Sequence, residues 1–236
     1  MSHLEGSIVV TGGTGALGSA VVTELLSSGA RVVATWVVGS ERDRIETELG
    51  ELGQLELVEA DLLSEDGADA AIEAAMAAPP LAAVVNLVGG YAAGGRVHEA
   101  PPDEFERMLQ LNVMTAYRTS RAALPAMLEG GGGSIVCVGA KAAVEPFSGA
   151  SGYITAKEAV IEFARALAVE YRDDGVRANA VLPSVIDTPA NRAQMPDADH
   201  SKWVPPAEIA RVIRFLCSAD SAPISGASIP VYGRAG

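Results

Sequence analysis

The sequence has few of the residues from which metal sites, disulfides and membrane spans are built. It contains two cysteines, Cys137 and Cys217, and three histidines, and their spacing fits neither a zinc site nor a serine-hydrolase triad. We therefore expect both cysteines to be reduced thiols that pack in the core. No apolar run approaches the ~20 residues of a membrane span, and the amino terminus lacks the pattern of a signal peptide. These absences predict a cytoplasmic protein with no membrane partner.

Basic residues are also scarce. The chain has 17 lysines and arginines against 30 aspartates and glutamates, which gives a formal net charge of −13. Such a charge argues against nucleic acid or an anionic membrane as a partner, although a local basic pocket for a phosphate is compatible with it. The chain has 236 residues, of which 49% are hydrophobic, and this is enough for one large core. We expect a single domain spanning residues 1–236.

Strand-like and helix-like stretches alternate along the chain. The alternation predicts an α/β fold, a doubly wound parallel sheet of the Rossmann type with helices on both faces. Ligands of such sheets bind at the carboxyl ends of the strands, where Asn86, Ala140 and Pro183 should meet a glycine-rich turn. We expect a long helix over residues 105–128, broken near Pro125, and a polar loop over residues 184–201. The other expected strands cover residues 8–10, 31–35, 55–60, 81–85, 134–138, 178–183 and 228–231, and the other expected helices cover 19–26, 68–78, 206–216 and the stretch that Tyr153 opens.

Tyr153 and Lys157 form a Tyr-x-x-x-Lys pair at the start of an apolar helical stretch. Residues four apart share one face of a helix, so the Lys157 ammonium can lie close to the Tyr153 phenol and favour the phenolate. Such a tyrosine exchanges protons near neutral pH. An isolated pair of this kind also arises by chance, with a half-buried aromatic ring and a solvated lysine.

The amino-terminal segment reads as strand, glycine turn and helix. The β-branched run of residues 8–10 is followed by Thr-Gly-Gly-Thr-Gly-Ala-Leu-Gly over residues 11–18, and then by apolar residues at helical spacing. Glycines let the backbone approach a pyrophosphate, whose charge is held by the amides and dipole at the start of the helix. A glycine-rich run alone would equally fit a tight structural turn.

These motifs occur in the order that is typical of the short-chain dehydrogenase/reductase family, which the whole chain resembles. The matching positions are residues 11–18, Asp61, Asn86 with Gly89, Asn112, Tyr153 with Lys157, residues 183–188 and residues 224–226. Within the family the chain is most similar to dihydropteridine reductases, through Gly-Gly-Thr-Gly-Ala-Leu-Gly, residues 88–95, residues 139–143, and the stretch from Val181 to Trp203.

The resemblance implies a role for each matching residue. Tyr153 would protonate the substrate, Lys157 would tune Tyr153 and bind the nicotinamide ribose, and Asn112 would bend its helix and hold a water that relays protons. Substrate contacts would come from Tyr91, Ala140 and Ser184. The family also implies a homodimer or homotetramer. The expected cofactor-binding residues are Gly12, Thr14, Gly15, Ala16, Leu17, Gly18, Trp36, Asp61, Leu62, Asn86, Gly89, Tyr153, Lys157, Pro183, Val185, Ile186 and Thr188.

Two of these residues also have simpler explanations. Asn112 fits a polar residue on a solvated helix face. Asp61 precedes a helical stretch, and taken alone it is better explained as a helix cap than as a contact to adenine.

The chain departs from the family pattern at Ala140. Most of the family has a serine there that donates a hydrogen bond to the substrate carbonyl, and a methyl group cannot do so. Loss of such a donor costs about 100- to 1,000-fold in rate. Dihydropteridine reductases also have alanine at this position, because their quinonoid substrate is already electrophilic. Ser148 or Ser151 could replace the donor.

The second departure lies at the end of the second expected strand. NAD-specific relatives carry an acidic residue there that binds the ribose hydroxyls, whereas this chain has Trp36. Without that carboxylate a 2′-phosphate is not repelled, and Ser40 and Arg42 lie close enough to hold one, although Arg42 equally fits a solvated helix face. We expect NADP or NAD as cofactor, with NADP favoured.

Three functions fit the sequence. The first is an NAD(P)H-dependent reductase of an activated small molecule, such as a quinonoid pterin, a quinone or a conjugated carbonyl. The second is a ketoreductase or alcohol dehydrogenase of the broader family, which Ala140 disfavours. The third is a catalytically idle nucleotide-binding protein, which the Tyr153–Lys157 pair disfavours.

Overall fold

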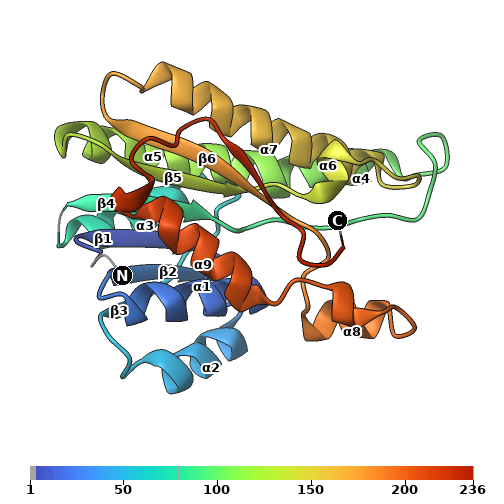
Figure 1. Cartoon of the computed structure of the whole chain (residues 1–236), viewed down its shortest axis with the longest axis horizontal. Coiled ribbons are helices and arrows are strands. Elements are labelled where there is room, and N and C mark those ends of the chain that lie inside the picture. The colour runs from blue at the N-terminus through green and yellow to red at the C-terminus, as the bar shows by residue number, and fades with distance from the viewer. Residues whose placement is uncertain (1–3, 79, 236) are drawn as a thin grey trace.

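A single parallel sheet organises the protein. The computed structural model describes residues 4–78 and 80–235, so expectations about residues 1–3, 79 and 236 lie outside it. The strand order is β3-β2-β1-β4-β5-β6-β7 (Figure 1). Successive strands are added on one side of β1 up to β3 and on its other side from β4 onward, so the switch point of the sheet lies between β1 and β4. This order confirms the predicted doubly wound sheet. The strands are β1 (Ser7–Thr11), β2 (Arg31–Trp36), β3 (Leu55–Glu59), β4 (Leu81–Asn86), β5 (Gly133–Val138), β6 (Val176–Pro183) and β7 (Ser228–Val231).

Helices cover both faces of the sheet (Figure 1). One face packs against α1 (Ala16–Ser27) and α9 (Pro206–Cys217), which also contact each other. The other packs against α3 (Glu65–Met76), α5 (Thr115–Glu129) and α7 (Ser151–Glu170). Each helix buries one apolar stripe on the sheet, which fixes the positions of the strand ends. The remaining helices are α2 (Gly39–Leu49), α4 (Pro102–Leu109), α6 (Lys141–Val144) and α8 (Pro189–Gln194).

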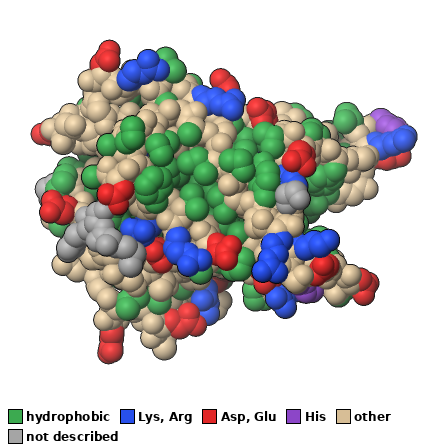
Figure 2. Space-filling model, viewed as in Figure 1, with side chains coloured by type: hydrophobic (Ala, Val, Ile, Leu, Met, Phe, Trp, Pro, Cys, Tyr) green, Lys and Arg blue, Asp and Glu red, His purple; other side chains and the backbone are tan. Residues whose placement is uncertain are grey.

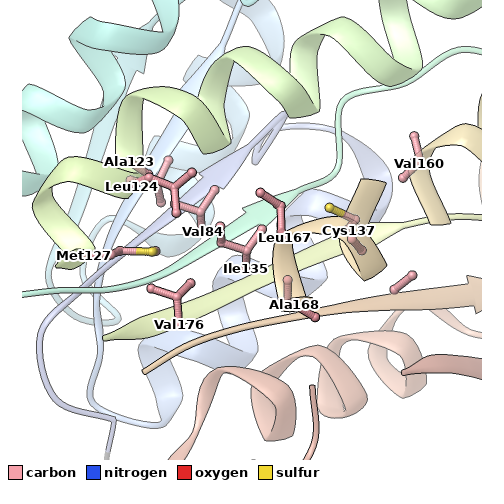
Figure 3. Packing of buried hydrophobic residues seen from close by; sticks show 14 of the residues in the cluster. Val84, Ala123, Leu124, Met127, Ile135, Cys137, Val160, Leu167, Ala168 and Val176 are labelled. Atoms are coloured by element: carbon pink, nitrogen blue, oxygen red, sulfur yellow. The ribbon is translucent and has the colours of Figure 1, made fainter. Parts of the chain in front are cut away.

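The long helix expected over residues 105–128 is irregular, but not where the sequence predicted. The break at Pro125 is wrong, because α5 continues through it to Glu129. Pro125 is exposed, so water can hydrate the helix carbonyl that receives no hydrogen bond from the proline nitrogen. The same turn is also held by Leu124 and Met127, which pack against Val84 and Ile135 of the sheet (Figure 3). The irregularity is instead a π-helical turn, η1 (Gln110–Met114), between α4 and α5.

The loop expected over residues 184–201 is also more ordered than predicted. It contains α8 and the 3₁₀ turn η2 (His200–Lys202). The Thr188 side chain accepts a hydrogen bond from the Asn191 amide and so caps α8, whose first residue is Pro189. This Thr-Pro signal was present in the sequence.

The carboxyl ends of the strands meet at one end of the molecule. Thr11 of β1 pairs with Asn86 of β4, which pairs with Cys137 of β5, and β6 ends at Pro183. The loops after these strands, together with α6 and α8, gather at this end (Figure 1). The predicted meeting of the glycine turn, Asn86, Ala140 and Pro183 is confirmed.

On the face in Figure 2, hydrophobic side chains gather in the middle, and most of the lysines and arginines lie below them, intermixed with acidic residues. In residues 4–78 and 80–235, no helix is both long enough and apolar enough to cross a membrane.

Candidate active site

Tyr153 and Lys157 lie on the first two turns of α7. Lys157 is buried, with 7% of its surface exposed, and its Nζ donates to the Val138 carbonyl at 2.9 Å. Val138 ends β5, two residues before Ala140, so this bond ties α7 to the strand end. Lys157 is therefore not a solvated helix charge.

Asn112 lies inside the π-helical turn and is 2% exposed. Its Oδ1 accepts from the Gly90 amide at 3.2 Å, and its Nδ2 donates to the Gly90 carbonyl at 3.1 Å and to the Met108 carbonyl at 2.9 Å. The alternative of a solvated helix face is therefore wrong. Within the π-helical turn, the Asn112 side chain donates to the Met108 carbonyl of the preceding helix. Its two hydrogen bonds to Gly90 hold the loop after β4 in place.

Gly89 brings Asn112 and Lys157 together. A Cβ atom added at Gly89 would lie 2.5 Å from Asn112 Oδ1 and 3.2 Å from Lys157 Nζ, so only glycine fits. Two residues later, the Tyr91 ring contacts the Tyr153 ring edge-on at 4.9 Å. Four predicted site residues on three segments of the chain thus form one cluster with Gly89.

The protonation of the pair differs from the prediction. Burial, and to a smaller extent the neighbouring Tyr91, raises the pKa of Tyr153 to about 12. Burial lowers the pKa of Lys157 to about 8. The expectation that Lys157 lowers the Tyr153 pKa is wrong in this structure, because desolvation dominates and the ammonium is directed to the Val138 carbonyl. Tyr153 keeps its proton at neutral pH.

Ala140 is buried at the strand end, in an extended conformation just before α6. Of the two serines considered as replacement donors, Ser148 is exposed and Ser151 is the partly buried first residue of α7. The hydroxyl of Ser184 donates to the Tyr232 carbonyl at 2.9 Å, so its proton is engaged with the carboxyl-terminal segment.

The glycine turn packs too closely for other residues. Gly12 has φ of 62°, a Cβ at Gly13 would lie 2.6 Å from the Ala34 Cβ, and one at Gly18 would lie 2.1 Å from the Gly12 carbonyl oxygen. No side chain caps α1, whose N-cap is Gly15, so its first amides are left for another acceptor. A close backbone approach and an uncapped helix start at the strand ends fit a pyrophosphate.

Thr14 of this turn is held by two side chains of α2. It is 2% exposed, its hydroxyl donates to Glu41 Oε2 at 3.1 Å, and its carbonyl accepts from Arg44 at 2.6 Å. Neither of these α2 residues was predicted from the sequence. Glu41 and Arg44 are three residues apart, and this spacing predicts that they share one face of a helix. The sequence does not indicate that this face packs against the glycine turn.

The other residues expected around the adenosine differ in exposure: Asn86 and Leu62 are buried, whereas Asp61 and Ala16 are exposed. Asn86 is 5% exposed and its amide donates to Ser120 at 3.1 Å, while Leu62 packs in a small apolar cluster. Asp61 does not cap α3, so that alternative is wrong. Ser64 is the cap, and Asp61 accepts from the Leu63 amide in its own turn. Ala16 and Leu17 begin α1, and Trp36 ends β2.

The segment after β6 is held against Val204. The amide of Val204 donates to the Val185 carbonyl, and Ile186 forms an isolated parallel bridge with Val204. The segment therefore runs alongside the strand ends between Pro183 and Thr188, at the same edge as the Tyr153 cluster.

Comparison with known proteins agrees with this geometry. The family model described as short chain dehydrogenase matches residues 7–199. A 2-(R)-hydroxypropyl-CoM dehydrogenase of Xanthobacter autotrophicus is 30% identical over 95% of this chain and 96% of its own. A short-chain type dehydrogenase/reductase from Mycobacterium ulcerans superposes with a TM-score of 0.94 at 25% identity, covering 100% of this chain and 91% of that one. A 3-oxoacyl-[acyl-carrier protein] reductase with bound NAD from Brucella melitensis gives 0.88 at 28% identity, covering 100% and 93%.

These relatives do not support the narrower resemblance to dihydropteridine reductases, since their names describe a hydroxyalkyl dehydrogenase and an oxoacyl reductase. The broader resemblance holds over most of the sequence, including the glycine turn and the Tyr153–Lys157 pair. The chain belongs to the short-chain dehydrogenase family of oxidoreductases.

Proposed function

We propose that this protein is an NAD(P)H-dependent reductase of a small, electrophilic substrate, with Tyr153 as the proton donor. The observation that carries the proposal is the cluster of Tyr153, Lys157 and Asn112 beside a buried Ala140, where a serine would supply a hydrogen bond. The proton donor is present and the carbonyl donor is absent. A substrate that accepts hydride without help, such as a quinone, a quinonoid pterin or a conjugated carbonyl, fits this combination.

A bound nicotinamide dinucleotide would supply the hydride. The turn over residues 12–18 and the first amides of α1 would hold its pyrophosphate. Lys157 would meet the nicotinamide ribose from the same side as Gly89, and residues 183–188 would flank the nicotinamide. NAD bound to the Brucella melitensis relative, which shares 28% identity, supports this assignment.

Tyr153 would give its proton to the substrate atom that gains negative charge. Its raised pKa keeps it protonated at neutral pH, which suits the direction of reduction. The Lys157 ammonium would then replace the lost proton by way of a water held near Asn112, and its pKa of about 8 would make this transfer possible near neutrality.

Tyr91 is a candidate for part of the missing donor role. Its ring touches that of Tyr153 and 55% of its surface is exposed, so its phenol can reach a substrate seated at Tyr153. It would either donate a hydrogen bond or form an aromatic wall for a planar substrate.

The test compares the unmodified enzyme with Ala140→Ser on a quinone, a quinonoid dihydropterin and an aliphatic ketone. We expect the unmodified enzyme to prefer the first two. Ala140→Ser should raise ketone reduction by about tenfold or more, because it adds one donor, and should leave the activated substrates little changed. Brisk reduction of the ketone alone by the unmodified enzyme would contradict the proposal.

The second candidate is a ketone reductase or alcohol dehydrogenase. The names of the relatives favour it, since one is an oxoacyl reductase. In that case a loop serine, Ser148 or Ser151, would have to supply the donor, and Ser→Ala at that position would abolish ketone reduction. The predicted homodimer or homotetramer stays a prediction, which light scattering on the purified protein tests.

A further inference from the structure

The end of β2 lacks the acidic residue that commonly binds the adenosine ribose of a dinucleotide. In dinucleotide-binding sheets this residue lies next to the glycine turn, and it binds the ribose 2′-hydroxyl. Here β2 ends in Trp36, followed by Val37 and Val38, which are 65% and 45% exposed. These residues bring neither a carboxylate nor a cation to the ribose.

A carboxylate reaches the turn from α2 instead. Glu41, in the first turn of that helix, accepts the Thr14 hydroxyl hydrogen bond at Oε2. Thr14 is almost fully buried within the glycine turn, so the carboxylate is fixed at the turn itself. Among the described residues, no lysine or arginine forms an ion pair with Glu41, and no hydrogen bond engages its Oε1. That oxygen can accept from a hydroxyl group.

The nearby cations do not cancel this charge. Arg42 stacks over Trp36 at 5.5 Å and is paired with Asp43 and Glu46, in the hollow between α2 and β3. Arg44 does reach the turn, where it donates to the Thr14 carbonyl, but its charge is paired with Glu48. Glu41 therefore brings a carboxylate to Thr14, and the guanidinium that reaches the same residue already has Glu48 as its ion-pair partner.

We propose that Glu41 takes over the role of the missing strand-end acid and makes the protein selective for NAD(H) over NADP(H). Its carboxylate would accept hydrogen bonds from the ribose hydroxyls of NAD(H). The 2′-phosphate of NADP(H) would bring two negative charges to the same place and be repelled. This reverses the preference that Trp36 alone suggests. The inference rests on the proposed use of a nicotinamide dinucleotide.

The experiment measures binding, without turnover. Calorimetric titrations of NAD⁺ and NADP⁺, at one fixed ionic strength, are made with the unmodified protein, Glu41→Gln and Glu51→Gln. Glu51 is an exposed residue just after α2 and, within the described part of the chain, forms no hydrogen bond to Thr14 and no ion pair with an arginine, so its variant removes the same charge from a neighbouring position.

We expect the unmodified protein and Glu51→Gln to bind NAD⁺ about tenfold or more tightly than NADP⁺. This ratio in Kd corresponds to about one charge-assisted hydrogen bond. Glu41→Gln should weaken NAD⁺, strengthen NADP⁺ and bring the two within about threefold. Equal or tighter binding of NADP⁺ by the unmodified protein, or the same ratio in Glu41→Gln and Glu51→Gln, overturns the role of Glu41. Failure of both dinucleotides to bind would overturn the proposed function as well.

Discussion

The ring of Tyr91 stands edge-on against the ring of Tyr153, with the two centroids 4.9 Å apart and the planes at 79°. Tyr91 belongs to the loop after β4, which Asn112 holds through Gly90, whereas Tyr153 belongs to α7. The contact therefore joins the loop that follows one strand to the helix that carries the proton donor. It also contributes to the raised pKa of Tyr153.

Substitutions at Tyr91 separate its two possible roles. Tyr91→Phe keeps the ring contact and removes the hydroxyl, and Tyr91→Ala removes both. If the phenol donates to the substrate, Tyr91→Phe should lower kcat by about tenfold, and Ala140→Ser in the same protein should restore part of the loss. Steady-state rates with a conjugated carbonyl measure this. Unchanged kcat in Tyr91→Phe with a loss in Tyr91→Ala would assign Tyr91 to the wall of the site.

The burial of Lys157 predicts an unusual pH dependence of stability. Its pKa in the folded protein is about 8, below the ordinary value of 10.5. Below pH 8 the lysine is charged in both the folded and unfolded states, so the cost of burying the charge is fully present. As the pH rises above 8, the folded protein releases the proton first, and stability should increase.

Lys157→Met is the control, because it cannot titrate. Between pH 7 and pH 9.5 the free energy of unfolding of the unmodified protein should rise by about 2 kcal/mol relative to Lys157→Met. Cys137 and Cys217, whose pKa values burial raises to about 11 and about 12, act in the opposite direction in both proteins and cancel in the difference. A constant difference across this range in urea unfolding would contradict a buried, titrating amine.

Gly18 should be the least replaceable residue of the glycine turn. Gly18→Ala places a methyl group 2.1 Å from the Gly12 carbonyl oxygen, so the turn must shift. We expect a loss of about 1 to 3 kcal/mol in the free energy of unfolding and a loss of at least about tenfold in dinucleotide affinity. Gly39→Ala is the matched control, because nothing lies within 4 Å of its added methyl group at the start of α2. If Gly18→Ala and Gly39→Ala changed the dinucleotide affinity equally, the result would contradict a role of the glycine turn in binding.

The sheet and the cluster of site residues followed from local patterns in the sequence. Strand–turn–helix alternation predicts a parallel sheet, and a parallel sheet necessarily brings the residues after β1, β4, β5 and β6 to one edge. Motif spacing placed Tyr153 and Lys157 on one helix face. These conclusions need only periodicity and connectivity.

Three features could not be predicted from the sequence because they depend on tertiary packing. Pro125 looked like a helix break, yet the burial of Leu124 and Met127 on the sheet keeps α5 intact. The Tyr153 pKa looked like a matter of one lysine, yet desolvation governs it. No sequence pattern pointed to Glu41, and only the docking of α2 shows that its carboxylate reaches Thr14.

The role of Tyr153 as the proton donor is tested most directly by the rate of Tyr153→Phe with a quinone or conjugated carbonyl, measured alongside calorimetric binding of the cofactor to the same protein. The phenyl ring fills the same space and keeps the contact with Tyr91, but it has no proton to give. We expect turnover to fall by at least about 100-fold, with cofactor affinity within about twofold of that of the unmodified protein. Turnover comparable to that of the unmodified protein would contradict Tyr153 as the proton donor.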